Sequence, residues 1–523
     1  MTTPAVHRMA RRAGALACLA VCLPLFAAPA LGQLNFKPLT RGDYEETEEK
    51  QIVLRGLDAG VDYANRLGSL RGDNIPKDML GTRHYTDIRL HLNTVMHRDV
   101  SLRLTLQPDE TTVRSDNLRQ EYPSTEHGKG RMAEGQSSAV TFRDAYLRWA
   151  YNPGSAILAG KHEISIGDRR GKVFNAITNA VTFDCKVGTW CMPFGYAQMG
   201  PKGGDALYHW GLEYTAWELP RESSALNDLF KVEVFRVVYN EWNIPLGRNL
   251  GPTARDYSDP LLPDDSQITD TTGGGSSPVY YDAREQDYYG LRLNWESGVM
   301  FYNLDAVGMR GNRHYHHYRD PEIGISTNIY GGAAGKIKVK TKGRVFETEL
   351  GTRWETGRVG LRFMEASGDP YLADPDAPRN VKRNLEGYYE ILPGAYRGSR
   401  LYFNGADSDL DSGAGLGHSI NNTRLYGLFL DVNERASRKM AYNMGIYKLE
   451  KVHSIPSSDG PPQRDIGVEM NNLITWYIHE AIRLQTEINF IEIGPAFTYA
   501  DHLTPRKKTG RVVQSLARFI YQF

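Results

Sequence analysis

The chain has 523 residues, and its 62 basic and 62 acidic side chains give a formal net charge of zero. A neutral chain has no global field to attract nucleic acid, so we expect no nucleic-acid partner. The sequence shows no Pro/Ser-rich linker, no repeat of fixed period and no break in composition. These features exclude a string of small modules and favour one large domain.

The first 32 residues have the parts of a secretory signal peptide. A basic start ends at Arg12, an apolar run covers 13–27, and a small-x-small site at 30–32 precedes Gln33. We predict a cleaved signal over 1–32 and a short periplasmic segment over 33–50. The protein is therefore expected to be exported.

Alternating side chains then recur along the rest of the chain. The clearest case is 100–107, where Val100, Leu102, Leu104 and Leu106 alternate with polar residues. A period of two is typical of a β-strand with one apolar and one polar face. The same pattern predicts about eighteen strands, at 51–67, 86–96, 100–107, 140–151, 156–163, 180–186, 189–199, 206–217, 229–239, 289–295, 299–309, 345–354, 359–366, 423–432, 439–449, 466–477, 482–490 and 511–523.

Connections between these strands alternate in length. Short turns such as 152–154 and 297–298 alternate with long stretches such as 108–136 and 367–422. After Gln33 no apolar run is long enough for a membrane helix. Outer-membrane barrels combine short periplasmic turns with long extracellular loops, whereas soluble sandwiches do not require this asymmetry. We predict an all-β fold over 51–523: a single transmembrane antiparallel β-barrel of about 18 strands in the outer membrane of a Gram-negative bacterium, wide enough for an aqueous channel.

The last strand illustrates the expected arrangement of the two faces. Phe519, Tyr521 and Phe523 share one face, and Arg518 lies on the other. Aromatic residues on the lipid face suit a membrane interface, so Arg518 is expected in the lumen. A terminal Phe on such a strand resembles the assembly signal of bacterial outer-membrane proteins, which implies recognition by the barrel-assembly machinery. The strand is expected to pair with 51–67.

Two further patterns leave alternatives open. Cys185 and Cys191, which remain after the signal is removed, could form a disulfide, stay as free thiols or supply half of a metal site. Alternating carboxylates at 407–413 would suit calcium or a solvated loop. We predict neither a metal nor another cofactor.

Several stretches resemble the alginate-export family of outer-membrane β-barrel porins. They are 157–170, 363–369, 400–405 with 415–419, and 465–470. Their order along the chain carries the resemblance, which spans about 156–523. The resemblance implies a monomeric barrel that exports an anionic polyuronate through an arginine-lined constriction. Lys161 departs from the family pattern, because it stands where the family has Arg and cannot bind a carboxylate as a fork.

Basic residues are the candidate site, because a polyanion needs fixed cations along the lumen and arginine binds carboxylates best. Most candidates are basic residues at alternate strand positions that are expected to face the lumen, and two, at 169–170, lie in a loop that could line the constriction. The alternative is that these cations form lumenal ion pairs that brace the barrel. The candidates are Arg89, Arg103, Arg148, Lys161, Arg169, Arg170, Arg292, Arg353, Arg362 and Arg483.

We expect passive export or diffusion of an anionic polysaccharide, alginate-like, or of a related small anionic solute. The alternatives are a general or small-solute porin, an outer-membrane hydrolase with a loop active site around His418 and Ser419, and a barrel whose lumen is occupied by a partner. We expect outer-membrane lipid around the barrel and no enzymatic activity.

Overall fold

The computed structural model divides into two units, Met1–Val53 and Leu54–Phe523. The first unit lies outside the described residues, and so do the expected signal peptide and the segment 33–50. The account below concerns the second unit alone. The described residues are 55–72, 81–97, 99–108, 111–114, 140–166, 170, 172–198, 206–219, 228–241, 280–316, 337–368, 384–385, 387–388, 390–391, 396–403, 416, 418–433, 439–457, 460–497 and 510–522.

The described part of the chain is built from β-strands, and it contains no helix long and apolar enough to cross a membrane. The strands are β1 (Arg55–Gly72), β2 (Gly81–His97), β3 (Val100–Pro108), β4 (Thr111–Arg114), β5 (Val140–Asn152), β6 (Ser155–Ile166), β7 (Phe174–Val187), β8 (Trp190–Gln198), β9 (Ala206–Leu219), β10 (Asp228–Glu241), β11 (Tyr280–Ser297), β12 (Met300–His316), β13 (Ile337–Trp354), β14 (Gly357–Ala366), β15 (Asn384–Leu385), β16 (Thr423–Val432), β17 (Met440–Ser457), β18 (Gly460–His479), β19 (Ile482–Ile493) and β20 (Gly510–Gln522).

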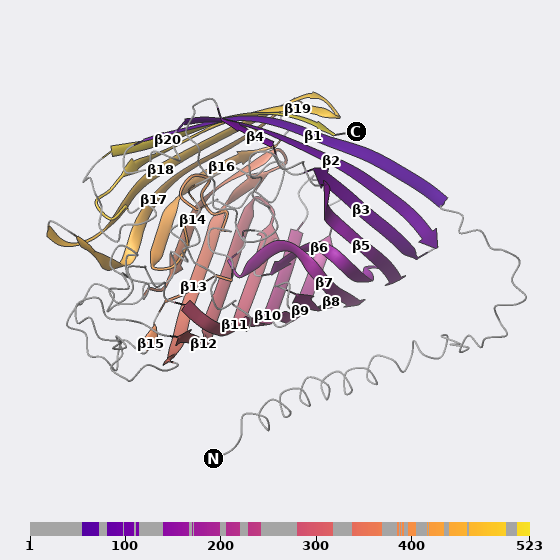
Figure 1. Ribbon diagram of the computed structural model, residues 1–523, viewed down its shortest axis with the longest axis horizontal. Coiled ribbons are helices and arrows are strands. Elements are labelled where there is room, and N and C mark those ends of the chain that lie inside the picture. The colour runs from indigo at the N-terminus through magenta and orange to yellow at the C-terminus, as the bar shows by residue number, and fades with distance from the viewer. Residues whose placement is uncertain are drawn as a thin grey trace, which may run out of the picture. The chain divides into compact units, whose positions relative to one another are not determined.

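All twenty strands belong to one sheet, which closes on itself. β1 pairs with β20 in antiparallel register from Asp62 opposite Gln522 to Gly72 opposite Val512, and Figure 1 shows the first and last strands side by side. β4 is a short strand that pairs with β2, as β3 does, and β15 is a two-residue parallel addition to β13. The remaining eighteen strands form the antiparallel ring, which confirms the predicted fold class and the closing pair.

Short turns join the strands at one end of the barrel. Gly154 and Gly298 have φ values of +80° and +54° in the turns that follow β5 and β11. Glycine adopts this left-handed conformation without steric cost. These turns therefore have the residues that their geometry requires.

Exposed apolar side chains cover the outer surface of the ring. Strand pairing shows which residues share this face, because residues directly opposite each other point the same way. Examples on five different strands are Leu90, Trp210, Leu291, Leu361 and Ile488. On β20, Phe519 is 40% exposed and the adjacent Arg518 is 1% exposed. An apolar exterior around a polar interior defines a barrel that spans a membrane.

The two cysteines lie on opposite faces of the β7–β8 hairpin. Cys185 pairs with Met192, and Lys186 pairs with Cys191. Cys185 therefore points outward beside Val187, and Cys191 points inward. Both are free thiols on opposite faces, so of the alternatives left open by the sequence the structure has free thiols and not a disulfide.

Strands at the long-loop end extend beyond the predicted bounds. β13 begins at Ile337, whereas alternation predicted a start at 345. In the first part of β13 the outward positions are occupied by Lys340, Lys342 and Arg344 and not by apolar residues. A strand with a basic outer face gives no apolar signal, which explains why this part was missed.

Candidate functional site

Two segments of the long loops fold into the barrel. The first comprises Arg170, Lys172 and Val173, between β6 and β7, and the second comprises the described parts of 387–422. Backbone bonds tie them together: Arg397 N–H donates to the carbonyl of Arg170 at 2.9 Å and Ile391 N–H to that of Val173 at 3.2 Å. The infolded segments therefore form one unit inside the ring.

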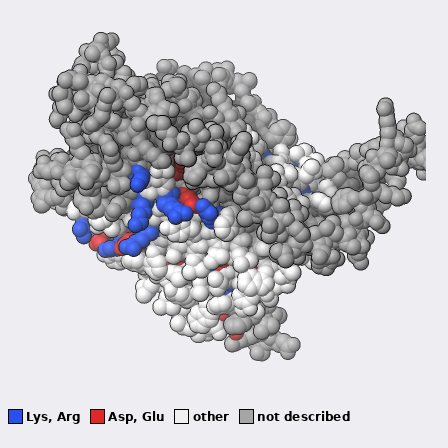
Figure 2. Space-filling view, turned by 90° about the horizontal axis from the view of Figure 1, so that it is seen from below, with Lys and Arg blue, Asp and Glu red and all other residues white. Residues whose placement is uncertain are grey.

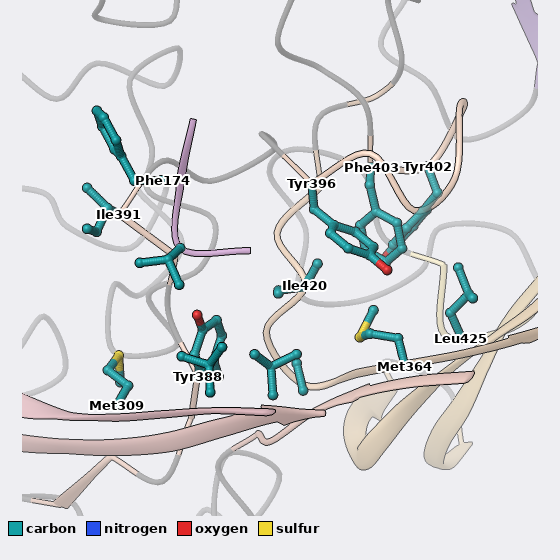
Figure 3. Packing of buried hydrophobic residues seen from close by; sticks show 14 of the residues in the cluster. Phe174, Met309, Met364, Tyr388, Ile391, Tyr396, Tyr402, Phe403, Ile420 and Leu425 are labelled. Carbon is teal, nitrogen blue, oxygen red and sulfur yellow. The ribbon is translucent and has the colours of Figure 1, made fainter. Parts of the chain in front are cut away.

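Apolar and aromatic side chains pack this unit against the inner wall. Figure 3 shows the rings of Tyr396, Tyr402 and Phe403 close together, with Met364 of β14 and Leu425 of β16 nearby. The ring centroids of Tyr396 and Phe403 are 5.1 Å apart, and those of Tyr402 and Phe403 are 4.9 Å apart. All five side chains are essentially inaccessible to solvent. The barrel thus has its apolar core in the lumen, where the loops meet the wall.

Charged residues attach the first segment to β12 and β13. Arg170 divides its guanidinium between Glu347 at 2.5 Å and Glu349 at 2.6 Å. Lys172 is fully buried, and its ammonium contacts Glu347 at 2.5 Å and Asp305 at 2.7 Å. Buried charges at these distances compensate each other's lost hydration.

The same chain of contacts continues along the wall in both directions. Arg362 Nε lies 2.8 Å from Glu349, and its Nη1 donates to the carbonyl of Gly398. On the other side, Arg292 contacts Asp305 at 3.2 Å and Glu233 at 3.0 Å. We call this array the interior ion-pair chain; its members, alternating in sign, are Glu233, Arg292, Asp305, Lys172, Glu347, Arg170, Glu349 and Arg362.

Acids on β18 and β19 hold the second segment. Glu469 accepts the backbone N–H groups of Arg400, Leu401 and Tyr402 at 2.8–3.1 Å. Arg400 also reaches Glu487 at 2.8 Å, and Glu487 accepts from Arg518 at 3.2 Å. Arg518 thus lies inside the barrel, as the sequence predicted. The infolded unit is anchored to separate parts of the wall, at β12–β14 and at β18–β20.

His418 and Ser419 belong to this packing. Ser419 Oγ donates to Glu390 at 2.5 Å and accepts from the N–H of Asn421 at 3.1 Å. His418 stacks on Tyr402 with ring centroids 4.2 Å apart. Burial, with a smaller contribution from Lys451, lowers the pKa of His418 to about 3, while burial beside Glu469 raises the pKa of Tyr402. Both residues therefore stay neutral at ordinary pH.

The structure places most of the predicted basic residues inside the barrel. Arg170 enters with the infolded segment, and the inward wall residues are Arg89, Arg103, Arg148, Arg292, Arg353, Arg362 and Arg483. Arg353 pairs with Glu296 near a short turn. Arg169 lies outside the described residues.

The prediction for Lys161 is wrong. Lys161 pairs with Ala145 of β5, whose outward face continues with the exposed Leu147 and Trp149. The apolar residues Ile164 and Ile166 of β6 are buried on the inward face instead of facing lipid, so Lys161 lies on the opposite, outward face. Lys161 is therefore on the outside.

Only some of the inward arginines remain available to a solute. Arg170, Arg292 and Arg362 are neutralised within the interior ion-pair chain. By contrast, Arg103 on β3 and Arg148 on β5 are exposed, and neither forms an ion pair with a described residue. They are neighbours, because Arg103 pairs with Tyr146 and Ser101 pairs with Arg148.

Sequence reasoning missed Lys172 and the acids that bind it. Lys172 lies in a loop, where no periodicity assigns a direction to a side chain. The partners of Glu347 and Glu349 come from a segment about 175 residues away, which a strand pattern does not indicate. Within the described residues, no cluster of His, Cys, Asp and Glu could hold a metal. The carboxylates at 407–413 lie outside the described residues.

These features define the class of protein: an integral β-barrel of the kind found in the outer membrane of Gram-negative bacteria. No protein-family model matches the chain, and no curated protein matches it. Solved structures are similar at low identity. OccK11 (OpdR) of Pseudomonas aeruginosa is 10% identical with a TM-score of 0.46, over 89% of this chain and 96% of that one.

Two other solved structures give similar values. OccAB4 of Acinetobacter baumannii is 9% identical with a TM-score of 0.47, over 90% of this chain and 100% of that one. The outer-membrane protein OpdK of Pseudomonas aeruginosa, solved with vanillate, is 11% identical with a TM-score of 0.45, over the same shares. The resemblance to the alginate-export family stays a prediction.

Proposed function

We propose that the protein is a channel that passes small anionic solutes across the outer membrane by diffusion. The observation that carries this proposal is the pair Arg103 and Arg148. These two exposed guanidinium groups lie on neighbouring strands and face the interior. Neither forms an ion pair with a described residue, although Asp184 of β7 interacts electrostatically with Arg148, so both can attract an anion and bind a carboxylate by paired hydrogen bonds.

The infolded unit favours a small solute over a polymer. It is anchored to two separate parts of the wall by buried ion pairs and by the aromatic cluster, and it occupies interior space in the described barrel. A monomeric uronate needs less of the remaining interior space than a polyuronate does. Export of an alginate-like chain is therefore the second candidate, supported by the sequence resemblance.

Enzymatic activity has less support. The hydroxyl of Ser419 is engaged with Glu390 and Asn421, and it orders the loop. A nucleophile would need that hydroxyl open to substrate, whereas Ser419 and Glu390 are both buried. We propose a non-enzymatic monomer, since one chain closes the ring by itself.

The test is ion selectivity in planar bilayers. The reversal potential in a salt gradient is expected to show a preference for anions in the wild type, and Arg103→Gln with Arg148→Gln should remove most of it. Arg358→Gln is the matched control, because Arg358 also faces inward but pairs with Asp431 at 2.9 Å. Glucuronate and oligouronates of increasing length are then added to one side of the bilayer. A reduction of the current by the monomer alone supports the small-anion channel, whereas a reduction by the longer oligomers supports polyuronate export. Cation preference in the wild type, or equal effects of both variants, would contradict the anion site.

A further inference from the structure

A row of cations lies on the outward face of β13, at its long-loop end. Lys340, Lys342 and Arg344 occupy alternate positions, and all three are exposed. The next outward residues on this strand include Phe346 and Leu350, which are 39% and 48% exposed. The row therefore begins where the apolar outer surface ends, at the height expected for lipid headgroups.

None of these three cations forms an ion pair with a described residue. Their neighbour on β12 is Arg310, which pairs in register with Lys342 and is 67% exposed. Arg310 contacts Asp287 of β11 at 3.3 Å, and Arg236 of β10 contacts the same carboxylate at 2.7 Å. We call the five cations the outer basic patch: Arg236, Arg310, Lys340, Lys342 and Arg344.

The outer basic patch has a clear excess of positive charge. On the outward face of the same strands, the described acids at this height are Asp287 and Glu285. Figure 2, which looks at the molecule from below the view of Figure 1, shows Lys and Arg gathered along one margin of a broad uncharged area. On β13, Arg344 is followed on the same face by the exposed Phe346, so the patch and the apolar surface are continuous.

Several outward cations on other walls have an acidic partner or neighbour. Arg424 of β16 contacts Glu365 at 2.6 Å, and Lys448 of β17 contacts Asp465 at 2.5 Å. Arg511 of β20 pairs in register with Glu492. Each of these three cations thus has an acidic partner or neighbour, whereas Lys340, Lys342 and Arg344 form no ion pair with a described residue.

Lys340, Lys342 and Arg344 form no ion pair with a described residue, and the pairs of Arg236 and Arg310 are exposed, so the patch contributes little to folding and is free for another role. Alternate residues on a strand are about 7 Å apart, and a row with this spacing can contact several phosphate oxygens at once. A ligand that also carried acyl chains would lay them on the apolar wall below. We propose that the outer basic patch binds the phosphate groups of a phosphorylated glycolipid in the surrounding leaflet.

The experiment uses the full chain folded in detergent micelles and bisphosphoryl lipid A as the probe. Binding is measured by native mass spectrometry and by displacement of a fluorescent lipid A. The test variant carries Lys340→Ser, Lys342→Ser and Arg344→Ser, and the matched control carries Arg424→Ser, Lys448→Ser and Arg511→Ser. Both remove three outward cations at the same end of the barrel, and the heat-modifiable band on gels verifies folding.

Each cation near an anionic lipid is expected to contribute about fivefold in affinity, so the test variant should bind about 100-fold more weakly. Lys342→Ser alone should lose about fivefold, and the control less than threefold. A dephosphorylated glycolipid should bind the wild type as weakly as bisphosphoryl lipid A binds the test variant.

Three results would overturn the proposal. One is the absence of lipid A binding to the wild type, and another is an equal loss in both triple variants, which would indicate a general electrostatic attraction. The third is displacement of lipid A by an equimolar amount of inorganic phosphate, which would indicate a site for the free anion. None of these outcomes depends on whether the barrel conducts ions.

Discussion

The two faces of β13 carry opposite charges. The charges on the inner face are buried and paired, whereas those on the outer face are exposed. Inside, Glu347 and Glu349 are buried and matched by Arg170, Lys172 and Arg362. Outside, Lys340, Lys342 and Arg344 are exposed and unmatched among the described residues. Burial removes hydration, so an interior charge must find a partner and becomes part of the framework. A charge at the water interface needs no partner and stays free for a ligand.

This comparison separates structural from functional charges. The interior ion-pair chain has four cations and four anions, so its dense charge gives no net attraction for an anion. The candidate contacts for solutes and lipids are instead the unmatched arginines and lysines on exposed surfaces. The following predictions test that distinction, beginning with the largest expected effect.

Glu347→Gln should be the most destabilising change. It leaves the buried ammonium of Lys172 with only Asp305 among its described acidic partners and weakens the attachment of Arg170. Removing one partner of a buried pair costs about 3–5 kcal/mol. Urea unfolding in detergent, followed by the heat-modifiable band, measures the loss. A loss below 1 kcal/mol would show that the interior charges are not a framework.

Glu469→Gln should release the second infolded segment while the ring stays closed. The amide keeps one acceptor oxygen for the three N–H groups that Glu469 binds, and a buried donor left unsatisfied costs about 1–3 kcal/mol. Trypsin cleavage at Arg400 should accelerate in the folded barrel. Glu492→Gln, an exposed outward acid on β19, is the control and should leave cleavage unchanged.

Lowering the pH should loosen the same segment. An unfolded histidine titrates near 6.5, whereas the pKa of His418 in the fold is about 3. The unfolded state therefore binds more protons, so the stability is present above pH 6.5 and is lost as the pH falls toward 3. Hydrogen exchange of 396–403, corrected for intrinsic rates, should be faster at pH 5 than at pH 7.5. His418→Phe keeps a stacked ring without titration and should flatten this dependence.

Asp287→Asn should have the smallest effect. Asp287 pairs with Arg236 and Arg310, whose side chains are 42% and 67% exposed. Exposed pairs contribute less than about 1 kcal/mol. The same urea assay used for Glu347→Gln provides the measurement, and a loss comparable to that variant would remove the difference between the two faces.

Periodicity predicted the barrel because every strand of a ring in a membrane must separate apolar from polar residues. It succeeded at β3 and β20, whose outer faces meet lipid. It failed at the start of β13, where the outward residues are basic, and at β6, where the apolar Ile164 is buried on the inward face. Alternation reports two faces, but it does not report what each face contacts.

The charged residues inside the barrel show most clearly what the sequence alone cannot determine. By itself, the sequence determined an all-β chain, the two faces of its strands and the inward direction of Arg518. Only the tertiary structure decided which inward charges are neutralised, because Arg170 and Lys172 reach acids about 175 residues away through a loop that has no period. Strand patterns are local, whereas the pairing of charges depends on where the closed ring brings distant segments together.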